Sequence, residues 1–201
     1  MKLLYRLLLV RHGQADSNQR GAFLGRQDDP LTEKGREQAA SLRDRMTHEQ
    51  IDIMVASPLK RASSTADILV EHRDLTFETD PRLMEQDYGK WDGITFPEAK
   101  DRFPRDFQSW MSGNPEIGPT GGENLTQVTA RVMDCYQDRA PAIPAGGTMM
   151  WVSHAGALQS LLCRKMGLDL CNQWPFMLQP GSLAELQIYD TGPRLTRLSW
   201  V

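Results

Sequence analysis

The stretch Leu7-Leu8-Leu9-Val10-Arg11-His12-Gly13 joins four apolar residues directly to an arginine, a histidine and a glycine. A short apolar run without polar interruption is typical of a strand that is buried on both faces of a sheet. A similar arrangement returns in Ile51–Ala56, which precedes Ser57-Pro58, and in Thr148–Ser153, which precedes His154-Ala155-Gly156. Three such strands, each followed by a polar turn, predict a sheet whose strands are largely parallel.

Helical patterns lie between the predicted strands, over Glu33–Met46 and Leu59–Glu71. Parallel strands need crossover connections, and helices usually supply them on both faces of the sheet. We therefore expect an α/β protein, a three-layer αβα fold with a mostly parallel central sheet. The alternating runs Leu183–Tyr189 and Leu195–Trp200, on either side of a turn at residues 190–193, predict a terminal hairpin or edge pair.

Length and composition limit the classes to which the chain can belong. With 201 residues, 40% of them hydrophobic and 24% charged, it has the profile of one globular domain over residues 1–201. A net charge of -3 argues against a nucleic-acid partner, because nucleic-acid-binding domains usually carry a basic face. The three cysteines form no Cys-x-x-Cys pair, and no stretch approaches the ~20 apolar residues of a membrane span. We expect a cytoplasmic protein with no membrane partner.

The three predicted strands end in groups that suit an anion. In open α/β sheets, ligands bind beyond the carboxyl ends of the strands. There Arg11 offers a bidentate guanidinium, His12 a nucleophilic imidazole, and Gly13 room for the backbone to approach a ligand. Ser57-Pro58 predicts a serine-capped helix start, so Arg61, four residues later, is expected beside free backbone N–H groups.

Each of these features has an ordinary explanation when it stands alone. Ser57 and Arg61 fit a capped helix with a surface arginine, and His154 fits a hydrogen-bonded structural histidine. An Arg-His-Gly tripeptide also occurs by chance in many proteins. Two histidines and two arginines at separate strand ends together favour a site for a dianionic ligand, and no pattern of metal ligands accompanies them.

Further motifs follow in order along most of the chain. They are Leu9–Gln14 with Asn18, Gly25–Thr32, Gly35 with Gln38-Ala39, Ser57–Ala62 with Thr65-Ala66, Leu83–Glu85 with Tyr88–Gly93, Gly121–Glu123 and Val152–Gly156. In this order and spacing they resemble the histidine phosphatase superfamily, in the branch that includes cofactor-dependent phosphoglycerate mutase. The resemblance implies a phosphoglycerate mutase-like fold.

The resemblance also implies a mechanism without a metal or a cofactor. In this family the first histidine, here His12, attacks phosphorus, and water then hydrolyses the phosphohistidine. The position of Glu85 implies that it protonates the departing alkoxide and later deprotonates water; the alternative is a solvated carboxylate in an acidic loop. The implied catalytic residues are His12, Glu85 and His154. The implied phosphate-binding residues are Arg11, Arg61, His154 and Asn18.

Two positions depart from the common family pattern. Ala15 stands where many members have threonine, and Gln159 stands where many have arginine. Loss of a basic group at residue 159 is expected to weaken binding of substrates that carry a second anionic group. The departures leave the phosphoryl-transfer groups complete and leave the substrate open.

Residues 94–120, which we call the lid segment, lie between Gly93 and Gly121. Mutases of the family have a considerably longer insertion there, and a shorter cover should admit water and release the product. This favours a phosphatase over a phosphoglycerate mutase. Phe103, Phe107 and Trp110 follow a helical spacing with Met111. They are expected either to face the substrate or to pack the lid segment onto the domain.

The expected activity is therefore hydrolysis of a small phosphomonoester, such as α-ribazole 5'-phosphate or a sugar phosphate. A non-catalytic phospho-ligand binding protein is disfavoured, because all the reactive groups are present. A homodimer through an exposed terminal strand is a further expectation.

Overall fold

A six-stranded mixed sheet forms the centre of the computed structural model, which describes residues 1–173 and 175–199. Its strands are β1 (Leu3–Arg11), β2 (Ile53–Ala56), β3 (Glu78–Thr79), β4 (Thr148–Ser153), β5 (Leu183–Tyr189) and β6 (Gly192–Ser199). They lie in the order β3-β2-β4-β1-β5-β6. β1, β2, β3 and β4 pair in parallel, whereas β5 is antiparallel to both its neighbours. The mostly parallel sheet is confirmed.

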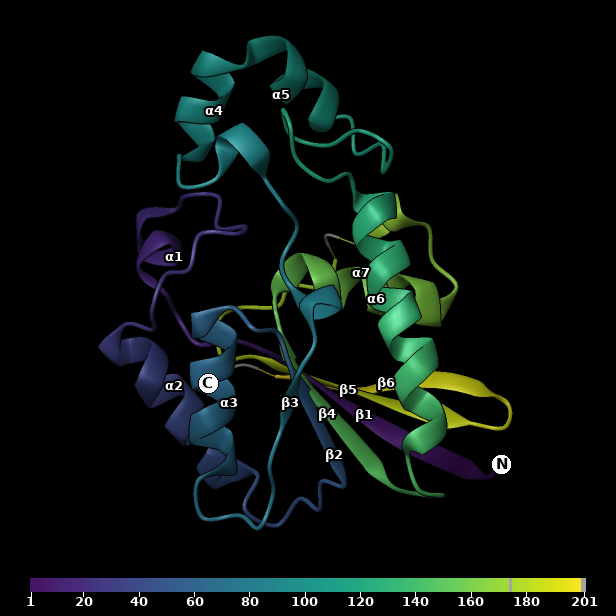
Figure 1. Ribbon diagram of the computed structural model, residues 1–201. Coiled ribbons are helices and arrows are strands. Elements are labelled where there is room, and N and C mark those ends of the chain that lie inside the picture. Colours follow the sequence, from purple (N-terminus) through teal and green to yellow (C-terminus); the bar gives the residue numbers. More distant parts are fainter. Residues whose placement is uncertain (174, 200–201) are drawn as a thin grey trace.

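Helices cover both faces of this sheet, with α2 and α3 on one side and α6 and α7 on the other (Figure 1). The α-helices are α1 (Asp16–Arg20), α2 (Glu33–Arg45), α3 (Lys60–Val70), α4 (Phe96–Arg102), α5 (Pro104–Trp110), α6 (Leu125–Arg139) and α7 (Ala155–Met166). Short 3-10 turns occupy Pro81–Leu83, Gly89–Trp91, Ala140–Ala142 and Leu170–Asn172. None of the helices in the described ranges is long and apolar enough to cross a membrane.

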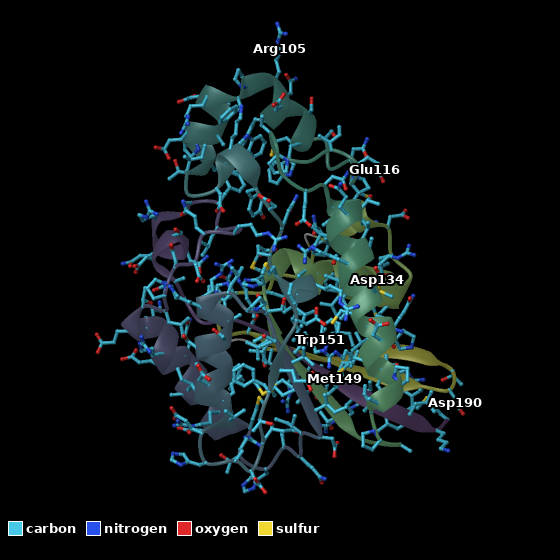
Figure 2. All side chains as sticks on the ribbon, viewed as in Figure 1. Arg105, Glu116, Asp134, Met149, Trp151 and Asp190 are labelled. Carbon is cyan, nitrogen blue, oxygen red and sulfur yellow. The ribbon has the colours of Figure 1, made fainter. Side chains whose placement is uncertain are left out.

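The alternation of side chains along β1 divides the core into two layers. Leu7 and Leu9 pack with β4 residue Trp151 into the cluster that contains α6 and α7. Leu8 and Val10 belong to the cluster on the opposite face, with α2 and α3. Successive strand residues point to opposite faces, so an uninterrupted apolar run supplies both layers at once. Figure 2 shows Met149 and Trp151 within the body of the molecule.

The predicted helices and the hairpin are confirmed to within a few residues. α2 begins after Thr32, whose hydroxyl accepts a hydrogen bond from the Gly35 N–H at 3.0 Å. α3 occupies most of the second helical stretch. β5 and β6 form a hairpin whose last pair is Tyr189 with Gly192, so β6 starts inside the expected turn. Trp200, the predicted end of this strand, lies outside the described residues.

The lid segment holds α4 and α5, which project beyond the carboxyl ends of the parallel strands (Figure 1). The expected helical stripe coincides with α5 and its caps, since Phe107 and Trp110 lie on the helix, Met111 is its C-cap and Phe103 its N-cap in a non-helical conformation before Pro104. The two ends of the segment meet at its base, where the Lys90 N–H donates to the Thr120 carbonyl at 3.0 Å. A side chain at Gly122 would come within 2.2 Å of the Asp87 carbonyl oxygen.

Candidate active site

Three strand ends meet at the carboxyl edge of the sheet, as expected from the sequence. β1 and β4 are parallel neighbours, and the His12 N–H donates to the Ser153 carbonyl at 3.0 Å. The two imidazole rings that follow these strands, His12 and His154, therefore lie with their centroids 5.0 Å apart. β2 flanks β4 on its other side and brings Ser57 to the same place.

The imidazole of His12 is buried and held in one orientation. Its Nδ1 lies 2.6 Å from the carbonyl oxygen of Gly13, so Nδ1 carries the proton and donates it. Nε2 is then the atom with the free lone pair. Burial, and after it the charges of Arg61 and Arg11, lowers the pKa of His12 well below its ordinary value of 6.5. The ring is neutral at pH 7, which is the state that a nucleophile requires.

Gly13 has a role different from the one expected. A Cβ at this position would lie 2.2 Å from the Gly35 carbonyl oxygen, which belongs to α2. The glycine is therefore required by close packing of this turn against a helix, and the prediction that it makes room for a ligand is wrong. The Gly13 N–H is also occupied, because it donates to the Thr65 hydroxyl at 3.1 Å.

Arg61 is fully buried, which excludes the surface arginine of the alternative explanation. Its Nε donates to His154 Nδ1 at 3.2 Å. Its two terminal nitrogens donate to the carbonyls of Gln27 at 2.7 Å, Gly25 at 2.8 Å and Leu24 at 3.4 Å. A guanidinium has five N–H groups, so one on Nη1 is left for a ligand. Burial lowers the pKa of Arg61 to about 10, with the charge of Glu85 opposing, so it remains a cation at pH 7.

The loop that receives Arg61 is itself fixed by Asp92. The carboxylate of Asp92 accepts from the backbone N–H groups of Gly25, Arg26 and Gln27 at 2.8, 2.7 and 2.9 Å. The carbonyls of Gly25 and Gln27 in this loop accept from the guanidinium of Arg61. Asp92 thus positions a phosphate-binding candidate without touching it. This role is not apparent from the sequence, because it depends on pairing two loops that are far apart along the chain.

The prediction that Ser57 caps the following helix is wrong. α3 begins at Lys60 with Leu59 as its N-cap residue, and the Lys60 N–H donates to the distant carboxylate of Asp28 at 2.6 Å. The Ser57 hydroxyl accepts from the N–H of Leu59, ahead of the helix, at 3.3 Å and lies 2.8 Å from His154 Nε2. Since Arg61 occupies His154 Nδ1 as a donor, the proton of His154 is on Nε2 and points to Ser57. Burial, then the charge of Arg61, lowers the pKa of His154, so this ring is also neutral.

Arg11 lies at the opening of the site. Its Nη1 donates to the Leu178 carbonyl at 2.5 Å, and its Nε is buried with no hydrogen-bond partner among the described residues. Asn18 and Arg11 line the same hollow of about 310 Å³. The Oδ1 of Asn18 accepts from the Ala15 N–H at 3.1 Å, which leaves its amide N–H groups as donors. An anion bound between Arg11 and Asn18 would accept hydrogen bonds from the guanidinium and from the amide N–H groups.

Glu85 is buried, so a solvated carboxylate in an acidic loop is excluded. Its two oxygens accept from the backbone N–H groups of Gln86 at 2.9 Å and Gly156 at 3.3 Å. Gly156 lies in the first turn of α7, and a Cβ there would come within 2.6 Å of the carboxylate. Arg131 holds the chain on the other side, donating to the Glu85 carbonyl at 2.9 Å and the Met84 carbonyl at 2.6 Å.

A cavity of about 290 Å³, which we call the Arg11 cavity, opens beside these groups. Arg11 and Gly156 form part of its wall, together with Tyr88, Trp110 and Gln159. The Nε2 of Gln159 donates to the Phe176 carbonyl at 2.6 Å. Tyr88 was not identified as a wall residue from the sequence, because its motif alone does not indicate which way the ring points.

The aromatic residues of the lid segment divide between the two predicted roles. Trp110 lines the Arg11 cavity. Trp110 also packs against Trp91, which lies outside the lid segment, with ring centroids 5.6 Å apart. Phe103 and Phe107 pack around the same indole, with ring centroids at 6.4 and 5.7 Å from it. Arg105 lies at the outer end of the lid and points away from the site (Figure 2).

Comparisons with known proteins agree with this architecture. The chain is 31% identical to an adenosylcobalamin/alpha-ribazole phosphatase of Salmonella typhimurium over 92% of this chain and 91% of that protein. It is also 31% identical to phosphoserine phosphatase 1 of Hydrogenobacter thermophilus, over 86% and 82% of the two chains. The crystal structure of the alpha-ribazole phosphatase from Shigella flexneri superposes with a TM-score of 0.87 at 27% identity, covering 96% and 95%.

The family model of the histidine phosphatase superfamily (branch 1) matches residues 7–201. The match covers both histidine-bearing strand ends, the arginine at residue 61 and the lid segment. Its extent leaves only the first six residues outside. The chain belongs to the histidine phosphatase superfamily, branch 1.

Proposed function

We propose that this protein is a metal-independent phosphomonoesterase in which His12 accepts the phosphoryl group. The observation that carries the proposal is the buried, oriented and neutral imidazole of His12, which lies 5.0 Å from the ring of His154 and within the field of Arg61 and Arg11. Membership in the histidine phosphatase superfamily supports a hydrolase of phosphomonoesters. The substrate is a small phosphorylated metabolite, and the relatives named alpha-ribazole phosphatase support α-ribazole 5'-phosphate or a compound of similar size.

In the first step, Nε2 of His12 attacks phosphorus in line with the ester oxygen. The N–P bond forms as the P–O bond to the alcohol breaks, and Glu85 gives its proton to the departing alkoxide. In the second step, water gives a proton to Glu85 and attacks the phosphohistidine. The N–P bond then breaks, which releases inorganic phosphate and restores the neutral imidazole.

The nonbridging oxygens are held by Arg11, Arg61 and Asn18, whereas both ring nitrogens of His154, expected from the sequence to bind phosphate, are occupied by Arg61 and Ser57. Phosphoryl transfer depends mainly on positioning and on stabilising charge on these oxygens. Arg61 is fixed before any ligand arrives, because the loop held by Asp92 occupies most of its donors. Such a group needs no reorganisation when the transition state forms. His154 contributes a neutral ring that supports Arg61 and Ser57 rather than a second cation.

The lid segment supports hydrolysis rather than mutase activity. It is short, and its aromatic residues pack chiefly against Trp91 and Phe23 at its base. The Arg11 cavity therefore stays open for the alcohol to leave and for water to reach the phosphohistidine.

Location in the cytoplasm and a homodimer through the β6 edge stay predictions, for which fractionation and light scattering are the respective tests.

The first prediction concerns the nucleophile. His12→Ala should lower turnover of p-nitrophenyl phosphate by at least about 10⁴-fold, as expected when a nucleophile is removed. The wild-type rate should be unchanged by EDTA, because no step requires a metal. The measurement is release of p-nitrophenol by both proteins with and without EDTA. Equal rates for the two proteins would exclude His12, and loss of wild-type activity in EDTA would indicate a metal enzyme.

The second prediction concerns the proton that Glu85 gives to the leaving group. Glu85→Gln should lower kcat/KM for alkyl phosphates by roughly 10²–10⁴-fold, the usual contribution of a general acid. For p-nitrophenyl phosphate the decrease should be less than about tenfold, since p-nitrophenolate leaves without protonation. kcat/KM is the correct readout, because it reports phosphoryl transfer and not hydrolysis of the phosphohistidine. An equal decrease for both ester classes would contradict the acid role.

The third prediction concerns pH. Since burial and two arginines lower the pKa of His12 below 6.5, the imidazole remains neutral as the pH falls through 6.5. The acidic limb of kcat/KM that belongs to the free enzyme should therefore lie below pH 6.5. Both depressed histidine pKa values also mean that the unfolded chain binds protons that the folded chain does not, so stability should fall as the pH drops below 6.5. A rate profile from pH 4 to 8 measures the first effect. An acidic limb near pH 7 would contradict it.

A further inference from the structure

The Arg11 cavity contains almost no charge. Among the described residues that line it, Arg11 is the one with a charged side chain. The other polar side chains of its wall are the phenol of Tyr88, the indole N–H of Trp110 and five carboxamides. These carboxamides are Gln86, Asn114, Gln159, Gln173 and Gln179. At about 290 Å³ the cavity falls at the lower end of small-molecule sites, which measure roughly 300–1,000 Å³.

Two of the carboxamides are held in fixed orientations. The Nε2 of Gln86 donates to the Glu123 carbonyl at 2.6 Å, and the Nε2 of Gln159 donates to the Phe176 carbonyl at 2.6 Å. A carbonyl oxygen accepts only from the N–H side of an amide, so each bond fixes which end is the oxygen. In both residues the Oε1 atom remains as an acceptor. Such acceptors suit a ligand that carries hydroxyl or N–H donors.

The remaining wall is aromatic and aliphatic. Tyr88 and Trp110 contribute their rings, and Ile117, Leu125 and Met177 contribute aliphatic surface. The phenol of Tyr88 stays un-ionised, because burial and then the charge of Glu85 raise its pKa. Tyr88 is therefore a neutral group in the wall of the cavity. A wall of this composition gives a carboxylate or a second phosphate no cation besides Arg11.

We propose that the Arg11 cavity selects phosphomonoesters whose alcohol portion is uncharged and carries hydrogen-bond donors. This inference rests on the proposed phosphatase function, in which the transferring phosphate already occupies Arg11. An additional anionic group would lose its hydration in the cavity without gaining a charged partner, and such a loss is costly. Removing hydroxyl groups from water costs less free energy, because the fixed amide oxygens of Gln86 and Gln159 can accept the hydrogen bonds that the hydroxyl groups otherwise donate to water.

Glycerol 3-phosphate and 3-phosphoglycerate test this proposal, because they differ only by a hydroxymethyl group in place of a carboxylate. For the wild-type protein, kcat/KM for glycerol 3-phosphate should exceed that for 3-phosphoglycerate by at least about tenfold. Gln159→Arg places a cation in the cavity wall and should lower this ratio by at least about tenfold. Gln108→Arg adds the same charge on the exposed outer side of the lid segment and should leave the ratio unchanged.

The outcomes separate this inference from the function on which it rests. Equal or preferred turnover of 3-phosphoglycerate by the wild-type protein, with normal turnover of p-nitrophenyl phosphate, overturns the selectivity alone. The wild-type comparison decides this even if Gln159→Arg does not fold, which circular dichroism reports. If Gln159→Arg and Gln108→Arg lower the ratio equally, the proposed selectivity is also overturned, because the added net charge would then explain the lower ratio. No turnover of any of the three esters overturns the proposed function itself.

Discussion

The parallel pairing of β1 with β4 is the constraint on which the site depends. It sets the imidazoles of His12 and His154 side by side at the carboxyl edge of the sheet. Burial, and after it the charge of Arg61, lowers the pKa of both rings, so neither takes up a second proton at pH 7. One geometric fact, two strands ending together, therefore produces both the position of the reactive nitrogen and its protonation state.

The cationic groups around His12 are held chiefly by backbone carbonyls. Arg61 donates to the carbonyls of residues 24, 25 and 27, and Arg11 donates to Leu178. Carbonyl dipoles hold a guanidinium in place without neutralising it, so its charge remains available to a dianion. Carboxylates bind the segments that hold these groups. Asp92 fixes the loop that holds Arg61, and Glu123 binds Arg131 behind Glu85.

Sequence reasoning identified the reactive groups better than the groups that position them. Arg11 is the last residue of β1, and His12 and His154 directly follow β1 and β4. Their positions were predictable from the sequence because the carboxyl ends of parallel strands meet at one edge of the sheet. The contacts of Ser57, Gly13 and Asp92 depend instead on segments distant in the chain.

The same limit explains the other differences from the sequence analysis. Lys60 is capped by Asp28, 32 residues away, so the short-range serine cap was the wrong choice. In the lid segment, Phe107 and Trp110 lie on the same helix and both contact the indole of Trp91, and Trp110 also lines the Arg11 cavity, so one apolar stripe serves both expected roles. Each difference arises where a tertiary contact overrides a local preference.

The closed base of the lid segment has an evolutionary consequence. Lys90 and Thr120 join where the segment leaves and re-enters the domain, and the glycine at residue 122 is packed too tightly to accept a side chain. Everything between these points can change in length without altering the distance that the chain must span. The segment is thus an exchangeable module, and its replacement would give a new set of alcohols to an unchanged phosphoryl-transfer apparatus.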